Sequence, residues 1–218
     1  MPHRTDGAYP RTMGFKSFLL HQLSRPSGLL APVTARLLNR GNARQNTDCI
    51  DALGLESDFK VLDIGFGGGV SFPRLLAECA EGRVAGTEVS PEMLARARST
   101  WAREIAKGRI EVVEGGAEHL VFGDDSFDRV MTVNTVYFWP ELQIGLGEVL
   151  RVLSPGGRFV ASVVSERALR KMGFADEGFR TESAAFYESA LEAAGFAKVR
   201  ADETGDTKGS VLVSGSKP

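Results

Sequence analysis

A short apolar strand that breaks into glycines constrains the fold of this chain more than any other stretch. Residues 61–64 read Val-Leu-Asp-Ile, and glycines follow at alternate positions, 65, 67 and 69. Ser71 then suits the cap of a helix. Glycines have no β-carbon, so the backbone can pass close to a ligand, and a helix N-terminus directs free N–H groups at it. The stretch therefore predicts a strand, a tight turn and a helix that together bind a nucleotide-type ligand.

The spacing of the glycines distinguishes between two kinds of nucleotide site. A dinucleotide turn has the pattern Gly-x-Gly-x-x-Gly and needs glycine at position 70, where this chain has valine. The run from Asp63 onward is instead acid-x-Gly-x-Gly-x-Gly. It resembles the cofactor loop of class I S-adenosylmethionine-dependent methyltransferases. The resemblance implies that Asp63, Gly65, Gly67 and Gly69 lie around the amino-acid end of that cofactor.

The resemblance extends from about residue 45 to the end of the sequence and follows four phrases in order. They are Leu-Asp-Ile-Gly-Phe-Gly-Gly-Gly, Glu-Val-Ser-Pro-Glu-Met-Leu, Asp-Ser-Phe-Asp-Arg-Val and Glu-Val-Leu-Arg-Val-Leu-Ser-Pro-Gly-Gly. Within the family, the chain is similar to the small-molecule group that includes the ubiquinone and menaquinone C-methyltransferases.

Two further strand ends carry candidate contacts to the cofactor. The second expected strand ends on Glu88 and Val89, and a carboxylate there can accept hydrogen bonds from both ribose hydroxyls. Beyond the third strand, the resemblance implies adenine contacts from Ala117 and Glu118. The family often has an aspartate at position 116, where this chain has glycine. That departure leaves the adenine to the backbone of Ala117 and the side chain of Glu118.

The acceptor-side candidates follow the fourth and fifth expected strands. Ligands of a parallel α/β sheet lie beyond the carboxyl ends of its strands, which places Asn134 and Tyr137 at the mouth of the pocket. We assign Asn134 to the cofactor site. An amine or thiolate acceptor needs no general base, whereas a phenol or a carbon acid benefits from one. The candidates for that catalytic base are Tyr137, Glu166 and, from the N-terminal segment, His21.

Alternating strand and helix patterns followed by a closing hairpin predict a doubly wound α/β fold. We expect a Rossmann-like sheet of seven mostly parallel strands. Its last two strands, near 197–202 and 210–214, should form a C-terminal antiparallel hairpin.

Two or three short helices are expected ahead of the first strand. Apolar residues recur at helical spacing in 15–23 and from 30 onward, with a break near 39–42, and a further helix should end at Gly54. We expect residues 1–45 to form an N-terminal helical lid and residues 46–218 to form the cofactor-binding domain.

Charge is unevenly distributed along the chain. The formal net charge is −2, yet residues 1–46 hold seven Lys or Arg against Asp6 alone. This basic arm suits an anionic or lipid-like acceptor, and a solvated helical face would carry the same charge. Nucleic acid is not an expected partner. The Asn-Thr-Val-Tyr after the fourth strand differs from the Pro-Pro-Tyr type of sequence in base-amino methylases.

The cysteines and the hydropathy bear on the compartment. Cys49 and Cys79 occupy apolar helical positions without a Cys-x-x-Cys or Cys/His partner, so neither a metal site nor a disulfide is expected. No apolar run reaches the ~18 residues of a membrane span, and the first residues lack a signal-peptide core. We expect a cytoplasmic protein with reduced thiols, and a homodimer remains open.

The predicted function is methyl transfer from S-adenosylmethionine to a small-molecule acceptor. In such a reaction the cofactor carries the reactivity, and the protein supplies alignment and a dry site. Two alternatives stay open. One is a non-catalytic regulatory module that binds S-adenosylmethionine. The other is an NAD-dependent oxidoreductase, which the glycine spacing disfavours.

Overall fold

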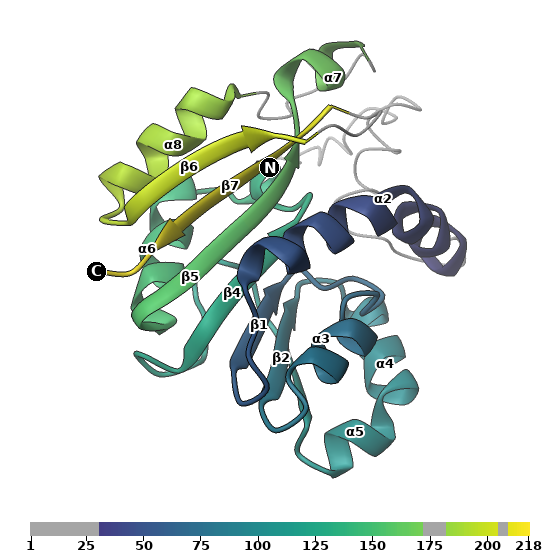
Figure 1. Ribbon diagram of the computed structural model, residues 1–218. Helices are drawn as coiled ribbons and strands as arrows, with labels where there is room; N and C mark the ends of the chain where they lie inside the picture. The colour runs from purple at the N-terminus through teal and green to yellow at the C-terminus, as the bar shows by residue number, and fades with distance from the viewer. Residues whose placement is uncertain (1–30, 172–181, 205–208) are drawn as a thin grey trace, which may run out of the picture.

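The computed structural model describes residues 31–171, 182–204 and 209–218. A seven-stranded sheet lies at its centre, with the order β3-β2-β1-β4-β5-β7-β6, and helices cover both faces (Figure 1). Neighbouring strands from β3 to β5 are parallel, and β7 pairs antiparallel with both β5 and β6. The expected doubly wound sheet with a closing antiparallel hairpin is confirmed.

The elements alternate along the chain as a parallel sheet requires. The strands are β1 (Lys60–Ile64), β2 (Arg83–Glu88), β3 (Ile110–Glu114), β4 (Phe127–Val133), β5 (Leu153–Val164), β6 (Ala197–Glu203) and β7 (Ser210–Ser216). The helices are α2 (Ala31–Leu53), α3 (Phe72–Glu78), α4 (Pro91–Thr100), α5 (Ala102–Ala106), the 3₁₀ turn η2 (Val136–Phe138), α6 (Leu142–Val152), α7 (Glu166–Lys171) and α8 (Ala184–Ala193).

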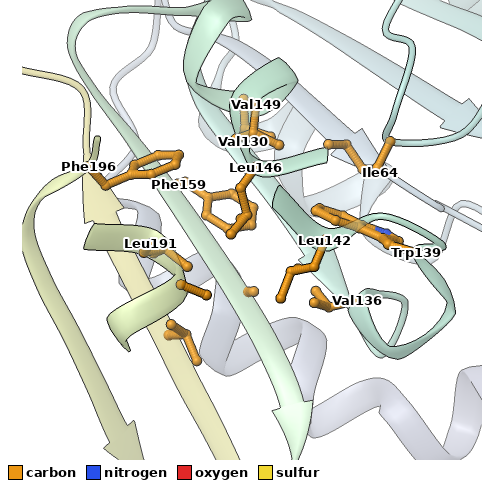
Figure 2. Packing of buried hydrophobic residues seen from close by; sticks show 14 of the residues in the cluster. Ile64, Val130, Val136, Trp139, Leu142, Leu146, Val149, Phe159, Leu191 and Phe196 are labelled. Carbon is orange, nitrogen blue, oxygen red and sulfur yellow. The ribbon is translucent and has the colours of Figure 1, made fainter. Parts of the chain in front are cut away.

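The central strands are buried on both faces, which explains why they are continuous apolar runs. In β1, Leu62 and Ile64 belong to a core with α6 and α8, whereas Val61 belongs to a second core with α2, α3 and α4. Figure 2 shows the first core, where Phe159 of β5 and Phe196 lie with ring centroids 5.9 Å apart. Full burial of one such side chain contributes about 1.5–3 kcal/mol.

Helix α2 differs from the sequence-based expectation. A break was predicted near residues 39–42, but the helix runs without interruption from Ala31 to Leu53, through Gly41. Cys49, Ile50 and Leu53 pack against β4 and β5, and glycine inside a helix costs only about 1 kcal/mol, so packing outweighs the propensity. The expected domain boundary at residue 45 lies inside this helix.

The segment 15–23, and with it the main part of the expected lid, lies outside the described residues. The division into a lid of residues 1–45 and a domain of residues 46–218 therefore stays a prediction.

Two smaller boundaries lie where local sequence patterns do not place them. Apolar residues four apart, at 93, 97, 101 and 105, predict one helix, but α4 ends before Trp101 and α5 begins after it. Turn residues at 154–157 predict a strand that begins at Arg158, but β5 begins at Leu153. The Ser-Pro-Gly-Gly stretch therefore belongs to the strand, and does not separate it from α6.

Candidate cofactor and methyl-transfer site

The three alternate glycines of the loop after β1 all have left-handed backbones, with φ of 72° at Gly65, 55° at Gly67 and 69° at Gly69. Each has a different neighbourhood. A Cβ on Gly65 would lie 2.6 Å from Thr135 Cγ2, and one on Gly69 would lie 2.9 Å from Trp101 Nε1. A Cβ on Gly67 would meet no atom within 4 Å. Gly65 and Gly69 are therefore needed for packing, whereas Gly67 borders open space beside the loop.

Glu88, at the carboxyl end of β2, holds the loop in place. Its Oε2 accepts a hydrogen bond from the Gly67 N–H at 2.8 Å, and its Oε1 accepts one from the Ser90 N–H at 2.9 Å. Ser90 in turn caps α4, since its hydroxyl accepts from the Met93 N–H at 3.3 Å. One buried carboxylate therefore joins the glycine loop to the start of the next helix, at the strand end where the ribose is expected.

Asp63 lies beneath the loop and is fully enclosed. Burial raises its pKa to about 7, and the nearby Glu88 charge adds to this, while a hydrogen bond donated by the Ser71 hydroxyl opposes it. The expectation that Ser71 caps α3 is wrong, because its side chain makes no cap hydrogen bond. Its hydroxyl points instead to the carboxylate, which is the stronger acceptor.

The adenine contacts were expected from Val89, Ala117 and Glu118. A Cβ on Gly116 would lie 3.1 Å from Glu118 Oε2 and 3.7 Å from Val89 Cγ1, so Val89 and Glu118 lie close together around Gly116, whereas Ala117 is buried in the core near Gly145. The other Glu118 oxygen, Oε1, is buried and has no hydrogen-bond partner within the described part of the chain. Gly116 leaves the space that the Glu118 carboxylate occupies, which accounts for the departure from the family's aspartate at position 116.

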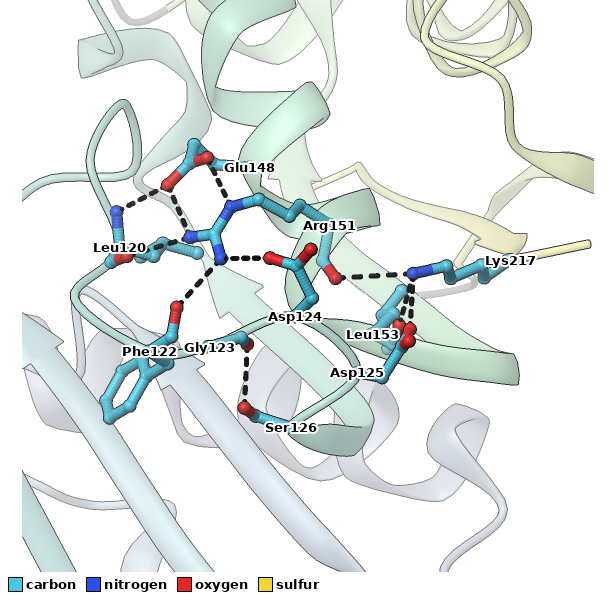
Figure 3. Close-up of polar contacts among 10 residues, drawn as sticks. All are labelled: Leu120, Phe122, Gly123, Asp124, Asp125, Ser126, Glu148, Arg151, Leu153 and Lys217. Carbon is cyan, nitrogen blue, oxygen red and sulfur yellow. Dashed lines mark hydrogen bonds and ion pairs between the residues drawn. The ribbon is translucent and has the colours of Figure 1, made fainter.

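A polar cluster around Arg151 stabilises the loop that leads from Glu118 to β4. Arg151 of α6 pairs with Glu148 at 2.7 Å and with Asp124 at 2.9 Å, and donates to the carbonyls of Leu120 and Phe122, both at 2.8 Å (Figure 3). Its guanidinium lowers the pKa of Glu148, whose carboxylate also accepts from the Leu120 N–H. Ion pairs and hydrogen bonds to the backbone therefore fix the loop between β3 and β4 to helix α6.

On the acceptor side, a buried polar network joins α2, β4 and β5. Gln45 of α2 is 1% exposed and pairs reciprocally with Asn134, at 2.8 and 3.2 Å. Asn134 has a φ of 58°, an uncommon conformation that asparagine tolerates better than most residues. The Tyr137 hydroxyl donates to Asn134 Oδ1 and accepts from the Val164 N–H at 2.9 Å. The network fixes the loop after β4 from both sides.

Gln45 was not singled out from the sequence, although a signal was present. It lies four residues before Cys49 and eight before Leu53, on the helix face that packs against the sheet. A polar residue on such an apolar face needs a partner, because an unpaired buried amide costs about 1–3 kcal/mol.

The three candidates for a catalytic base have different surroundings. Burial raises the pKa of Tyr137 above its usual range, so its hydroxyl stays protonated and holds Asn134. Glu166 begins α7 and pairs with Arg170 at 2.8 Å, and its side chain is 36% exposed. His21 lies outside the described residues.

Two further features concern the described residues as a whole. They contain no group of three or more His, Cys, Asp or Glu side chains arranged to hold a metal ion. None of the helices in these ranges is both long and apolar enough to span a membrane. Cys49 and Cys79 are buried free thiols.

Comparison with known proteins identifies the family. Residues 62–161 match the methyltransferase domain family. The chain is 33% identical to sterol 24-C-methyltransferase erg-4 of Neurospora crassa, over 49% of this chain and 28% of that protein. It is 37% identical to the ubiquinone/menaquinone biosynthesis C-methyltransferase UbiE of Methylobacterium nodulans, over 47% of this chain and 40% of that protein. The chain thus spans less than half the length of these two relatives.

The fold has solved counterparts as well. A SAM-dependent methyltransferase from Aquifex aeolicus superposes with a TM-score of 0.72 at 22% identity, covering 86% of this chain and 98% of that one. These similarities support a methyltransferase and neither of the alternatives that the sequence left open. Residues 62–161 are therefore a methyltransferase domain, and the fold is that of solved S-adenosylmethionine-dependent methyltransferases.

Proposed function

We propose that the protein transfers a methyl group from S-adenosylmethionine to a small-molecule acceptor. The observation that supports this most is the pairing of the Gly67 N–H with Glu88 beside an open face of the loop. A left-handed glycine with free space over it and a carboxylate fixed next to it suit the close approach of a ribose.

The described residues fit the cofactor at both of its ends. At the adenine end, the buried Glu118 Oε1 accepts no hydrogen bond from the residues that the structure describes, and an exocyclic amine is a matching donor. We assign Val89 and Ala117 to the same adenine pocket. At the other end, the loop from Gly65 to Gly69 and the carboxylate of Asp63 suit the charged amino-acid portion.

The cofactor supplies an electrophilic methyl group when it is bound, and the protein aligns the acceptor with it. We propose that Asn134 orients that end of the cofactor, and that Gln45 and Tyr137 hold Asn134 in place. A general base, where the acceptor needs one, would come from Tyr137, Glu166 or His21. The exposure of Glu166 favours it over the buried phenol, since proton exchange with water is direct there.

The nature of the acceptor is proposed from charge and from the relatives. An anionic or lipid-like molecule suits the basic arm of residues 1–46, and the named relatives are a sterol methyltransferase and a methyltransferase of ubiquinone/menaquinone biosynthesis. We further propose a cytoplasmic location, which the buried free thiols suit, and a homodimer as an assembly to test.

Calorimetry with S-adenosylhomocysteine and with NAD tests the cofactor first. Binding of the former and none of the latter is expected. A panel of quinols, phenols and sterols with radiolabelled cofactor then tests methyl transfer. Tight NAD binding without any response to S-adenosylhomocysteine would contradict the proposal.

A further inference from the structure

A basic pocket lies at the end of the sheet formed by β5, β7 and β6. It has a volume of about 280 Å³ and is lined by Arg158, Lys198, Arg200 and Ser216. That is slightly below the roughly 300–1,000 Å³ typical of pockets for drug-sized ligands, so a small ligand fits best.

The strand pairing brings these residues together. Arg158 of β5 pairs with Ser216 of β7, and Arg200 of β6 pairs with Ser214. Directly paired residues of antiparallel strands point to the same face, and Ser214 and Ser216 are two residues apart, so both arginines lie on one face of the sheet, on either side of β7. Arg158 Nη2 also donates to Ser214 Oγ at 3.4 Å. Helix α8 covers the opposite face of β6 and β7, with Leu191 against Val213.

An irregularity of β6 accompanies the pocket. The register shifts between Ala197 and Arg200, and Lys198 inside this bulge has a φ of 52°. A left-handed lysine is strained by roughly 1 kcal/mol or more, and bulges commonly redirect a side chain. Glycine would relieve the strain at this position, but it would remove a charge from the pocket.

The three cations of the pocket form no ion pair with any residue that the structure describes. Asp202, on the same strand as Arg200, forms none either. Elsewhere in the described ranges, Arg74 and Arg151 each pair with two carboxylates. Three positive side chains around one small cavity repel one another, and a bound anion would reverse that repulsion.

We propose that this pocket binds a small anion of the phosphate class. Two guanidinium groups can donate paired hydrogen bonds to phosphate oxygens, and an ammonium and a hydroxyl complete the donor set. The pocket is separate from the cofactor site. Arg158 lies six residues before Val164, the cofactor-side end of β5, a separation of about 20 Å at the usual rise of a strand.

Calorimetric titration with pyrophosphate at low ionic strength tests the proposal. The wild-type protein should bind, and Arg200→Gln or Lys198→Gly should weaken binding by roughly 10- to 100-fold, as expected for losing one charge-assisted contact. Arg83→Gln is the matched control, because Arg83 is exposed at the start of β2 and its loss changes the net charge equally. Affinity for S-adenosylhomocysteine should stay unchanged in all variants, which shows that they fold and separates this site from the proposed methyl transfer.

Absence of binding by the wild type, or equal affinity in the wild type and both pocket variants, would overturn the assignment. A second experiment, with lipid vesicles, identifies whether the phosphate group belongs to a lipid or to a soluble compound. Sedimentation with phosphatidylglycerol vesicles that depends on Arg200 and is reversed by pyrophosphate would assign a lipid headgroup. Pocket-dependent pyrophosphate binding without sedimentation would assign a soluble phosphate compound.

Discussion

The substitution Asp63→Asn should lower the free energy of unfolding at acidic pH and raise it at alkaline pH. Asp63 is fully buried, and its pKa is raised from 3.8 to about 7 in the folded protein. A raised carboxyl pKa means that the folded state binds a proton more tightly than the unfolded chain. Stability therefore falls as pH rises between about 4 and about 7, and is constant beyond that window.

The size of the effect follows from the shift. About three pH units correspond to about 4 kcal/mol, because one unit is worth 1.36 kcal/mol. Asp63→Asn removes this dependence and keeps an oxygen that can accept from the Ser71 hydroxyl. Its extra buried N–H donors cost about 1–3 kcal/mol at every pH. The variant should thus be less stable than wild type near pH 4 and more stable near pH 8.

Urea unfolding of both proteins from pH 4 to pH 8.5, followed by circular dichroism, measures the difference directly. Titrating groups that do not interact with Asp63 are common to both proteins and cancel in the comparison. Asp58→Asn, which neutralises an exposed carboxylate, serves as the matched control and should follow the wild type. A stability difference that does not change with pH would refute the reasoning, since the pKa of Asp63 would then be the same in the folded and unfolded states.

Three further predictions concern the site. Glu88→Ala should weaken binding of S-adenosylhomocysteine by about 1.5–3 kcal/mol in calorimetry, because the hydrogen bonds of Glu88 are those of a charged group. A variant that binds with wild-type affinity would disprove the role of Glu88 in the site. Gly67→Val should abolish that binding and lower the melting temperature only through strain at a left-handed backbone, while Gly65→Ala should lower the melting temperature through the same strain and through its clash with Thr135. Gln45→Leu should reduce the free energy of unfolding by about 1–3 kcal/mol, since the Asn134 side-chain N–H group loses its acceptor while Oδ1 keeps Tyr137. Unchanged urea midpoints would contradict this.

Local patterns predicted the sheet and the glycine turn after β1 well. The strands are apolar runs bounded by turn residues, and burial on both faces requires that pattern whatever the helices do. The positions of Gly65 to Gly69 and of Glu88 follow from the chain alone, because a strand end and the next helix start are adjacent in sequence.

What could not be predicted depends on contacts between distant residues. Gln45 and Asn134 are separated by 89 positions, and only the packing of α2 on the sheet brings them together. The same packing keeps α2 continuous through Gly41, against its local preference. Ser71 stands at a position typical of a helix cap, but the buried carboxylate of Asp63, eight residues earlier, accepts a hydrogen bond from its hydroxyl.

The position of β7 between β5 and β6 has a consequence for the order in which the domain assembles. The last strand of the domain to leave the ribosome is an interior strand of the sheet. Until it is inserted, β5 is an open edge of twelve residues and β6 has no strand to pair with. Open edges recruit other strands, so a nascent or shortened chain ending before Ser210 is exposed to aggregation. Folding of this sheet is therefore completed after synthesis of the domain, when β7 inserts between β5 and β6.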